Sequence, residues 1–436
     1  MTQTLTSARA PRRLPAPPST RPAGAHRDPA VDIARAACLV VVVLLHALMV
    51  GVAWGAHGPI LRNAMEGWLG FAPLSWVAQV MPLFFLLGGF SAHTQWERMR
   101  ERGAGYGDYL AGRMRRLFIP ATAALVAVAI LIGVLALAGV PGAVVATAGF
   151  RMSQPLWFLG VYVLCTAAVP PLLALHRRAP VTGVLVPAAL ALAVDIVRGA
   201  TGVTAIGFAN LLFVWLSVQQ LGFWLATGWP GRASRRTLAL VAAGACAFLV
   251  LLCAAGVYSL DMLANLNPPT CALLVLAVVQ LAVFLLVAPA LRAVADGPVV
   301  GRAVGWVSAR AMTVYLWHMP VLIVLAGALL VSGAALPEPV SAEWWLSRPL
   351  WLAAVLAAVA GVVAATGRFE AGSRGTARGP STPGPRALAS AAAGAGGILL
   401  VLVAGSALAA WVVAAALATL ALRILRRSDI RGAVTR

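Results

Sequence analysis

Long apolar stretches recur along this chain, with short polar segments between them. Each comes close to the roughly 20 apolar residues that a helix needs to cross a bilayer. Because the connecting segments are short, consecutive helices should run antiparallel. The pattern predicts an all-α polytopic transmembrane bundle, with a ten-helix core and an eleventh, C-terminal span. The spans are expected at about 31–54, 74–93, 116–138, 156–175, 181–197, 206–226, 237–257, 270–291, 311–332, 349–366 and 391–422.

Segments rich in Pro, Gly, Ser and Arg divide the chain, and such compositions are typical of disordered tails and flexible linkers. The last apolar stretch is long for one span and short for two. We favour a single crossing outside the ten-span core over a hairpin broken around Gly405. The expected parts are a disordered cytoplasmic tail (1–30), the ten-span core (31–366), a flexible linker (367–390), an additional transmembrane helix (391–424) and a basic tail (425–436).

Composition agrees with a membrane protein and excludes a soluble domain. The chain is 61% hydrophobic and 11% charged, with a mean hydropathy of +0.90. Its net charge of +20 comes from arginines that gather in loops, so it indicates topology and lipid headgroups, not nucleic acid. The loops opposite the N-terminus hold only Arg62, Arg151, Arg198 and Arg348. The asymmetry predicts a cytoplasmic N-terminus in a bacterial cytoplasmic membrane.

The first span contains two side chains that are costly inside a bilayer, Arg35 and His46. Their spacing is about three helical turns, which puts both on one face and about 16 Å apart along the axis. Ionisable groups within a membrane helix usually mark a functional site. The alternatives are a snorkelling arginine and a histidine that bridges helices. Asp32 lies one turn before Arg35, so the two can form an ion pair.

Arginines also open the third span, where Arg113 and Arg116 share a helix face and Arg115 points elsewhere. Two neighbouring guanidiniums suit a phosphate or a carboxylate, and the helix N-terminus adds positive potential. Arginines flank many cytoplasmic helix ends, however, and the bare pattern is equally consistent with a topology signal.

Three further segments carry candidate binding residues. Tyr315 and His318 are three positions apart in the ninth span and can face one cavity. Trp157 opens the fourth span, either as an interface anchor or as an aromatic platform for a sugar-like ligand. The paired Gly88 and Gly89 allow a helix or a ligand to approach the backbone closely. No cluster of carboxylates, histidines or cysteines has metal-ligand spacing, so no metal site is predicted.

Taken in order, these motifs resemble the family-3 integral membrane acyltransferases. Arg35 and His46 resemble the first-helix Arg-x10-His motif of that family, and Arg113-Met-Arg-Arg116 resembles its RxxR motif. The segments at 84–91, 156–159 and 315–318 follow in the expected order, and the resemblance covers about residues 28–366. The second-span segment departs from the family in reading Gly-Gly where Ser-Gly is common.

The resemblance implies transfer of an acyl group, often acetyl, from acyl-CoA to a hydroxyl of a carbohydrate, a lipid-linked glycan or a secondary metabolite. It implies no bound cofactor, because acyl-CoA, most simply acetyl-CoA, is a co-substrate. His46 is then the expected general base, assisted by Arg35 as the second catalytic residue. Arg113, Arg116, Tyr315, His318 and Trp157 are the expected substrate-binding residues.

Two other function classes are consistent with parts of the pattern. A transporter of an anionic or proton-coupled solute can also carry histidines and arginines inside a bundle. The hydropathy shows no internal repeat, and acidic residues are nearly absent from the span centres. A polyprenyl-phosphate glycosyltransferase needs acidic metal ligands, whereas Asp108, Asp261 and Asp296 are isolated.

Overall fold

The structure, a computed structural model, describes residues 28–55, 58–229, 232–333, 336–368, 370 and 381–434. Twelve helices in these ranges are long and apolar enough to cross a membrane, which confirms the predicted all-α polytopic class. The elements are α1 (Pro29–Met49), β1 (Val50–Gly55), β2 (Gly58–Asn63), α2 (Phe71–Ala78), α3 (Met81–Glu101), α4 (Tyr106–Leu137), α5 (Gly142–Ser153), η1 (Gln154–Leu156), α6 (Trp157–Arg178), α7 (Pro180–Thr201), η2 (Thr204–Ala209), α8 (Asn210–Ala226), α9 (Arg235–Ala254), α10 (Ala272–Ala295), α11 (Pro298–Ala309), α12 (Ala311–Val331), α13 (Ala342–Thr366), α15 (Gly384–Ala404) and α16 (Leu408–Val434).

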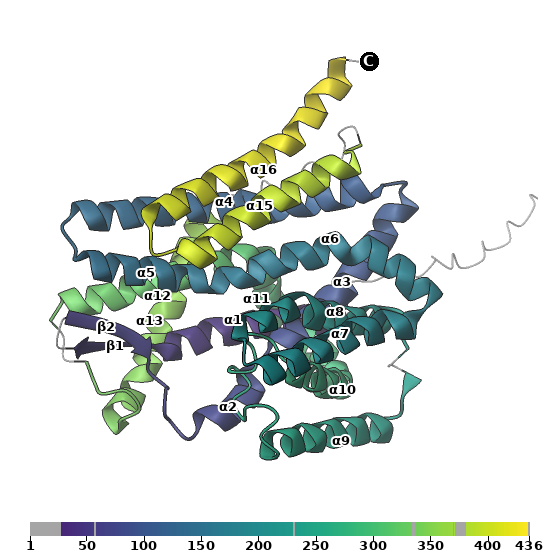
Figure 1. The fold of residues 1–436 in the computed structure, drawn as a ribbon, viewed down its shortest axis with the longest axis horizontal. Coiled ribbons are helices and arrows are strands. Elements are labelled where there is room, and N and C mark those ends of the chain that lie inside the picture. Colours follow the sequence, from purple (N-terminus) through teal and green to yellow (C-terminus); the bar gives the residue numbers. More distant parts are fainter. Residues whose placement is uncertain are drawn as a thin grey trace, which may run out of the picture.

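Helix α1 runs through the middle of the bundle and packs on α3, α10 and α12 (Figure 1). It begins where the Asp28 carboxylate accepts the backbone N–H of Ala30 at 3.0 Å, with a proline in the first turn. Small buried residues such as Ala34 and Ala47 let neighbouring helices approach it. A central α1 places its polar side chains inside the protein.

The first predicted span is shorter than expected. Helix α1 ends at Met49, and β1 and β2 form an antiparallel hairpin within the stretch assigned to the span and just beyond it. Gly51 lies against Ala64, where an added Cβ would come within 2.7 Å of the Ala64 Cβ. A continuous apolar run does not reveal by itself where a helix stops and a strand begins.

The second predicted span is broken into α2 and α3 at Gln79 and Val80. Pro82 lies in the first turn of α3 and has no N–H to bond backward, so a single continuous helix is disfavoured. Gln280 of α10 satisfies the groups freed by the break. Its amide donates to the Gln79 carbonyl at 2.7 Å and accepts from the Leu83 N–H at 2.8 Å. The break is therefore a bonded part of the fold beside the cavity described below.

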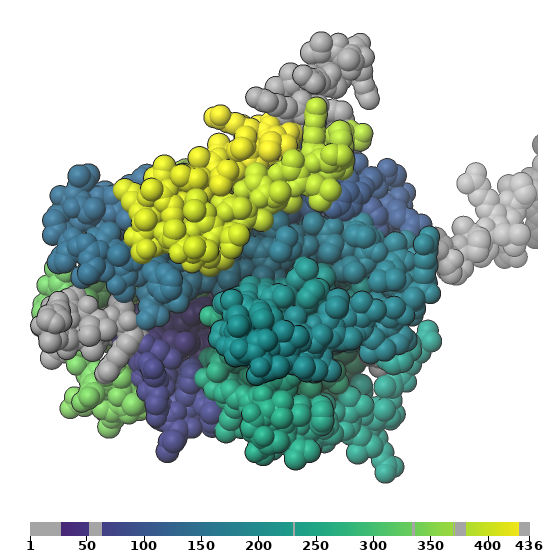
Figure 2. Space-filling view, viewed as in Figure 1, coloured from purple at the N-terminus to yellow at the C-terminus, as the bar shows by residue number. Residues whose placement is uncertain are grey.

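The C-terminal region corrects a prediction, because the expected single span is two helices. Helix α15 ends at Gly405, whose carbonyl accepts the Trp411 indole N–H at 2.8 Å, and α16 returns beside it. The two helices lie together across α4 and form one surface of the molecule (Figures 1 and 2). Helix α15 begins at Gly384, inside the expected linker 367–390, of which residues 371–380 lie outside the described ranges. Nearly all of the predicted tail 1–30 also lies outside them.

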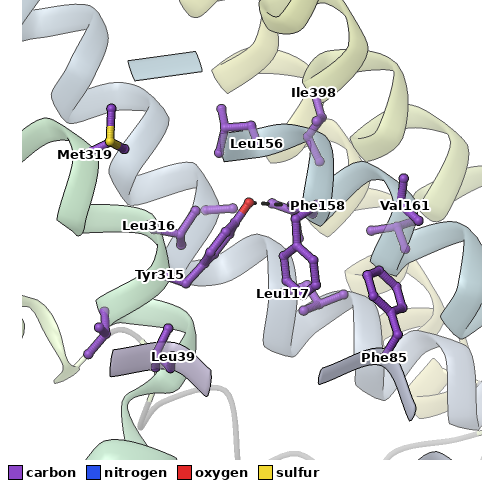
Figure 3. Close-up of a cluster of buried hydrophobic side chains, with 14 of the residues drawn as sticks. Leu39, Phe85, Leu117, Leu156, Phe158, Val161, Tyr315, Leu316, Met319 and Ile398 are labelled. Atoms are coloured by element: carbon purple, nitrogen blue, oxygen red, sulfur yellow. Dashed lines mark hydrogen bonds between the residues drawn. The ribbon is translucent and has the colours of Figure 1, made fainter. Parts of the chain in front are cut away.

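Aromatic side chains pack the centre of the bundle and fix the starts of the helices around the site. Phe85 of α3 stacks on Trp215 of α8, with ring centroids 4.4 Å apart. Phe158 of α6 lies edge-on to Tyr315 of α12, with centroids 5.1 Å apart (Figure 3). Such pairs add to the burial of apolar area and prefer defined geometries. The ends of α6 and α12 that meet the site are thus rigidly placed.

Candidate active site

One cavity of about 190 Å³ lies among α1, α3, α4, α6 and α12, with the loop before α10 closing part of it. Its volume equals that of about six water molecules in the liquid, enough for a small reacting group. It brings together six of the seven residues predicted to form the site: Arg35, His46, Arg113, Arg116, Trp157 and Tyr315. The seventh, His318, is fully buried directly behind His46.

The two histidines form a chain of hydrogen bonds. His318 Nδ1 lies 2.6 Å from the Tyr315 carbonyl oxygen, and His318 Nε2 lies 3.1 Å from His46 Nδ1. A carbonyl only accepts, so a neutral His318 carries its proton on Nδ1 and accepts through Nε2. His46 Nδ1 is then the donor, and its Nε2 keeps a lone pair that no described residue engages. The geometry fixes the tautomer of the cavity-lining ring and leaves a lone pair on its Nε2.

Arg35 reaches across to Ser91 of α3 and does not form the ion pair with Asp32 that their spacing allows. Its Nη1 donates to the Ser91 hydroxyl at 3.0 Å, and its guanidinium lies 5.5 Å from the centroid of the Phe84 ring. Ser91 in turn donates to the Leu87 carbonyl at 2.9 Å. The side chain points into the space between α1 and α3, where the Ser91 hydroxyl accepts from it. Arg35 is thereby held on the cavity wall.

Arg113 and Arg116 both line the cavity, and Arg115 points away from it. Arg115 donates to the Leu425 carbonyl at 3.2 Å, on the opposite side of α4. The Arg113 guanidinium lies 5.8 Å from the Tyr109 ring, and its Nε is buried with no hydrogen-bond partner in the described ranges. A buried guanidinium N–H without a partner destabilises the protein unless an anion or a water molecule accepts its hydrogen bond.

A family model for an acyltransferase domain, that of family 3, matches residues 28–367, the stretch that contains both arginine motifs. The chain belongs to the family-3 acyltransferases. No curated protein and no solved structure matches it. Membership makes the protein a membrane acyltransferase and confirms the family resemblance. It favours that class over the transporter alternative.

In this family-3 acyltransferase, Tyr315 lines the cavity, but its hydroxyl is already engaged. It donates to the Pro155 carbonyl at 2.8 Å and accepts the Leu159 N–H at 3.3 Å, at the start of α6. That contact sets the position of Trp157, whose ring also stacks on Trp215 with centroids 6.0 Å apart. Figure 3 shows the Tyr315 ring beside Phe158, with a dashed line at its hydroxyl. The Tyr315 hydroxyl thus holds the start of α6, and the Trp157 ring lines the cavity.

The paired glycines serve helix packing more than the cavity. A Cβ on Gly89 would overlap the Gln219 carbonyl of α8, and one on Gly222 would overlap the Leu86 carbonyl of α3. Gly88 has more room, because its nearest neighbour would be Tyr162 Cε2 at 3.8 Å. Of the two predicted uses of the glycines, the close approach of a helix is the one the structure shows at Gly89.

Glu370 is a cavity residue that the sequence analysis missed. It lies beyond the predicted core and beyond the family match, in the expected linker, yet it lines the cavity and is 1% exposed. Its carboxylate accepts the Thr313 N–H at 3.0 Å and the Thr313 hydroxyl at 2.7 Å, in the first turn of α12. A carboxylate at a helix N-terminus is favourable. The sequence did hold one signal for Glu370, because it is one of only 13 acidic residues in the chain and it lies just after a predicted span.

Proposed function

We propose that this membrane acyltransferase transfers an acyl group, most simply acetyl, from acyl-CoA to an acceptor hydroxyl, with His46 as general base. The observation that carries the proposal is that His46 and the three arginines line one cavity. Acyl transfer from a polyanionic thioester requires a group that takes up a proton and a region that binds anions. A titratable ring and a cluster of arginines in one cavity meet these two needs. The acceptor classes are a carbohydrate, a lipid-linked glycan or a secondary metabolite.

The donor is assigned to the arginine end of the cavity. Arg113 and Arg116 lie one turn apart, and Arg35 faces them from α1. Guanidiniums bind phosphate through paired, charge-assisted hydrogen bonds, and the unpartnered Arg113 Nε supports an anion there. Arg35 and His46 differ in depth by about 16 Å along α1. That depth suits a molecule bound by its phosphates at one end and reacting at the other.

The chemical step uses the lone pair of His46. Nε2 takes the proton of the acceptor hydroxyl while that oxygen bonds to the thioester carbonyl carbon. The carbon–sulfur bond then breaks, and the departing thiolate receives the proton from His46. His318 holds the ring through Nδ1, and the hydrogen bond to the Tyr315 carbonyl holds His318 in turn. Both are positioning residues in this proposal.

The orientation completes the proposal. We place the N-terminus and the arginine end in the cytoplasm of a bacterial cell, where acyl-CoA is made. The arginine-poor loops then face outward, in agreement with the positive-inside rule. If all twelve candidate helices cross the membrane, the C-terminal arginines return to the same side, whereas eleven crossings would leave them outside.

Labelled acetyl-CoA tests the function directly. Purified protein in nanodiscs should release free CoA thiol and move the label to a hydroxyl acceptor. The variant His46→Ala should bind acetyl-CoA and release no thiol above background. If the wild-type protein leaves the thioester intact with every acceptor class and with water, the acyl-CoA proposal is wrong. If His46→Ala keeps full activity, only the general-base assignment fails.

A further inference from the structure

The two ends of the cavity differ in chemistry. The end near the start of α1 carries Arg35, Arg113, Arg116 and Glu370. The end around His46 has no charged side chain among its described lining residues. Its walls are Leu45, Ala78, Val80, Leu263 and Leu266, with Trp157 beside them. The phosphates of the donor therefore suit the arginine end of the cavity, which leaves the apolar end for the acceptor.

Polar groups near the apolar end are already satisfied within the protein. The Gln79 side chain donates to the Met262 carbonyl at 3.1 Å and accepts the Met81 N–H at 3.3 Å. The Pro155 carbonyl accepts from Tyr315. Among the described residues, the polar side-chain groups at this end that no described residue engages are His46 Nε2 and the Trp157 indole N–H.

The apolar wall is also built in advance. Leu263 and Leu266 lie on the loop between α9 and α10, and three hydrogen bonds from α2 and the segment after it hold this loop. The Trp76 indole donates to the Leu260 carbonyl at 2.8 Å, and Gln79 binds the Met262 carbonyl. The Met262 N–H donates to the Ser75 hydroxyl at 2.8 Å. A wall held this way does not rearrange to offer polar groups.

From this asymmetry we infer that the acceptor presents an apolar surface, aliphatic or aromatic, next to its reactive hydroxyl. The inference rests on the proposed function and narrows its acceptor class. A bare sugar would lose the water around several hydroxyls and find at most two partners. Each unpaired buried hydroxyl weakens binding by roughly tenfold or more. An acceptor that carries its hydroxyl on an apolar body loses the hydration of that one hydroxyl, and the burial of its apolar surface favours binding.

Methyl and benzyl β-glucoside form a matched pair of probes, because both dissolve as single molecules and carry the same hydroxyls. With acetyl-CoA and protein in nanodiscs, kcat/KM should be at least tenfold higher for the benzyl compound. If neither compound is acylated, the concentration that halves acetyl-CoA hydrolysis should be at least tenfold lower for the benzyl compound. Equal values, or a preference for the methyl compound, overturn the inference and leave the acyltransferase function standing. No thioester consumption under any condition overturns both.

Two variants of the loop test whether the preference for the benzyl compound depends on the apolar wall of the cavity or only on the hydrophobicity of that compound. Leu266→Gln adds a polar group to the cavity and should cut the preference for the benzyl compound at least threefold. Leu260→Gln makes the same change on the same loop at a residue that is 54% exposed and does not line the cavity. It should keep the wild-type preference. Equal effects of the two changes contradict the assignment of this wall to the acceptor.

Discussion

His318 Nε2 lies 3.1 Å from His46 Nδ1, so a fully buried ring on α12 holds the ring of α1 that lines the cavity. The two residues are far apart in the sequence. Their contact orients His46 in the way that metal-site histidines are oriented by outer partners. In the proposed mechanism His46 meets the substrate and His318 holds His46 in place.

Substitutions of the two histidines should therefore lower kcat by different amounts, and a conservative substitution should restore part of the loss at His318. We expect His46→Ala to lower kcat about 10²- to 10⁴-fold, the range for loss of a general base. His318→Ala should lower it about 10- to 100-fold. His318→Gln should recover part of that loss, because its amide oxygen can still accept from His46 Nδ1. Thiol release from acetyl-CoA measures all three, and equal losses in both alanine variants contradict this division of roles.

Arg113 and Arg115 offer a matched pair on one helix. Arg113→Ala should raise the Kd for acetyl-CoA about 10- to 100-fold, because charge-assisted hydrogen bonds to phosphate are lost. Arg115→Ala removes the same charge from a side chain that bonds to Leu425 outside the cavity, and should leave the Kd within about twofold. Equilibrium binding of labelled acetyl-CoA checks both. A weaker complex with Arg115→Ala alone would reverse the donor assignment.

Glu370 should stabilise the start of α12. Glu370→Ala leaves the Thr313 N–H and hydroxyl without their acceptor, which costs about 1–3 kcal/mol. We expect a lower Tm, and Glu370→Gln should restore part of it because an amide oxygen remains. Glu338→Ala changes an exposed acid in the loop before α13 and serves as the control. An unchanged Tm for Glu370→Ala would mean that this carboxylate contributes nothing to the fold.

Gly88 and Gly89 are neighbours with different surroundings, so the same substitution should act differently. Gly89→Ala forces α3 away from the Gln219 carbonyl and should cost about 1–3 kcal/mol. Gly88→Ala meets Tyr162 at ordinary contact distance and should be tolerated. Thermal unfolding in detergent compares the two. Equal stability losses would show that helix propensity, and not the α3–α8 contact, sets the effect.

The ion pair of Asp28 with Arg292 predicts a pH dependence of stability. Burial of the carboxyl raises its pKa, but the hydrogen bonds from Arg292 and Ala30 and the arginine charge outweigh it, so the Asp28 pKa lies below its ordinary 3.8. The ionised group is favoured in the folded state, so its contribution is present above about pH 4 and is lost as the pH falls through the lowered value. Asp28→Asn keeps the helix cap and should flatten this part of a Tm-against-pH curve. An unchanged curve would show that the pair contributes nothing.

The membrane class, most helices and most of the residues that meet at the cavity could be predicted from the sequence. Apolar runs of fixed length and a spacing of whole turns are local properties, so the shared face of Arg35 and His46 and that of Arg113 and Arg116 follow from the chain alone. The helix breaks were harder to place. The interruption at Gln79 depends on Gln280, 201 residues away, and the hairpin at Gly405 depends on packing against α4.

Which side chains complete the cavity depends on how the helices pack. Glu370 belongs to a segment whose composition is that of a linker, and its burial arises from Thr313 on another helix. The Tyr315 hydroxyl and His318 are engaged with groups that no sequence spacing identifies, the Pro155 carbonyl and His46. Local patterns decide which face a side chain occupies, whereas the partner on that face is set by helix packing between distant segments.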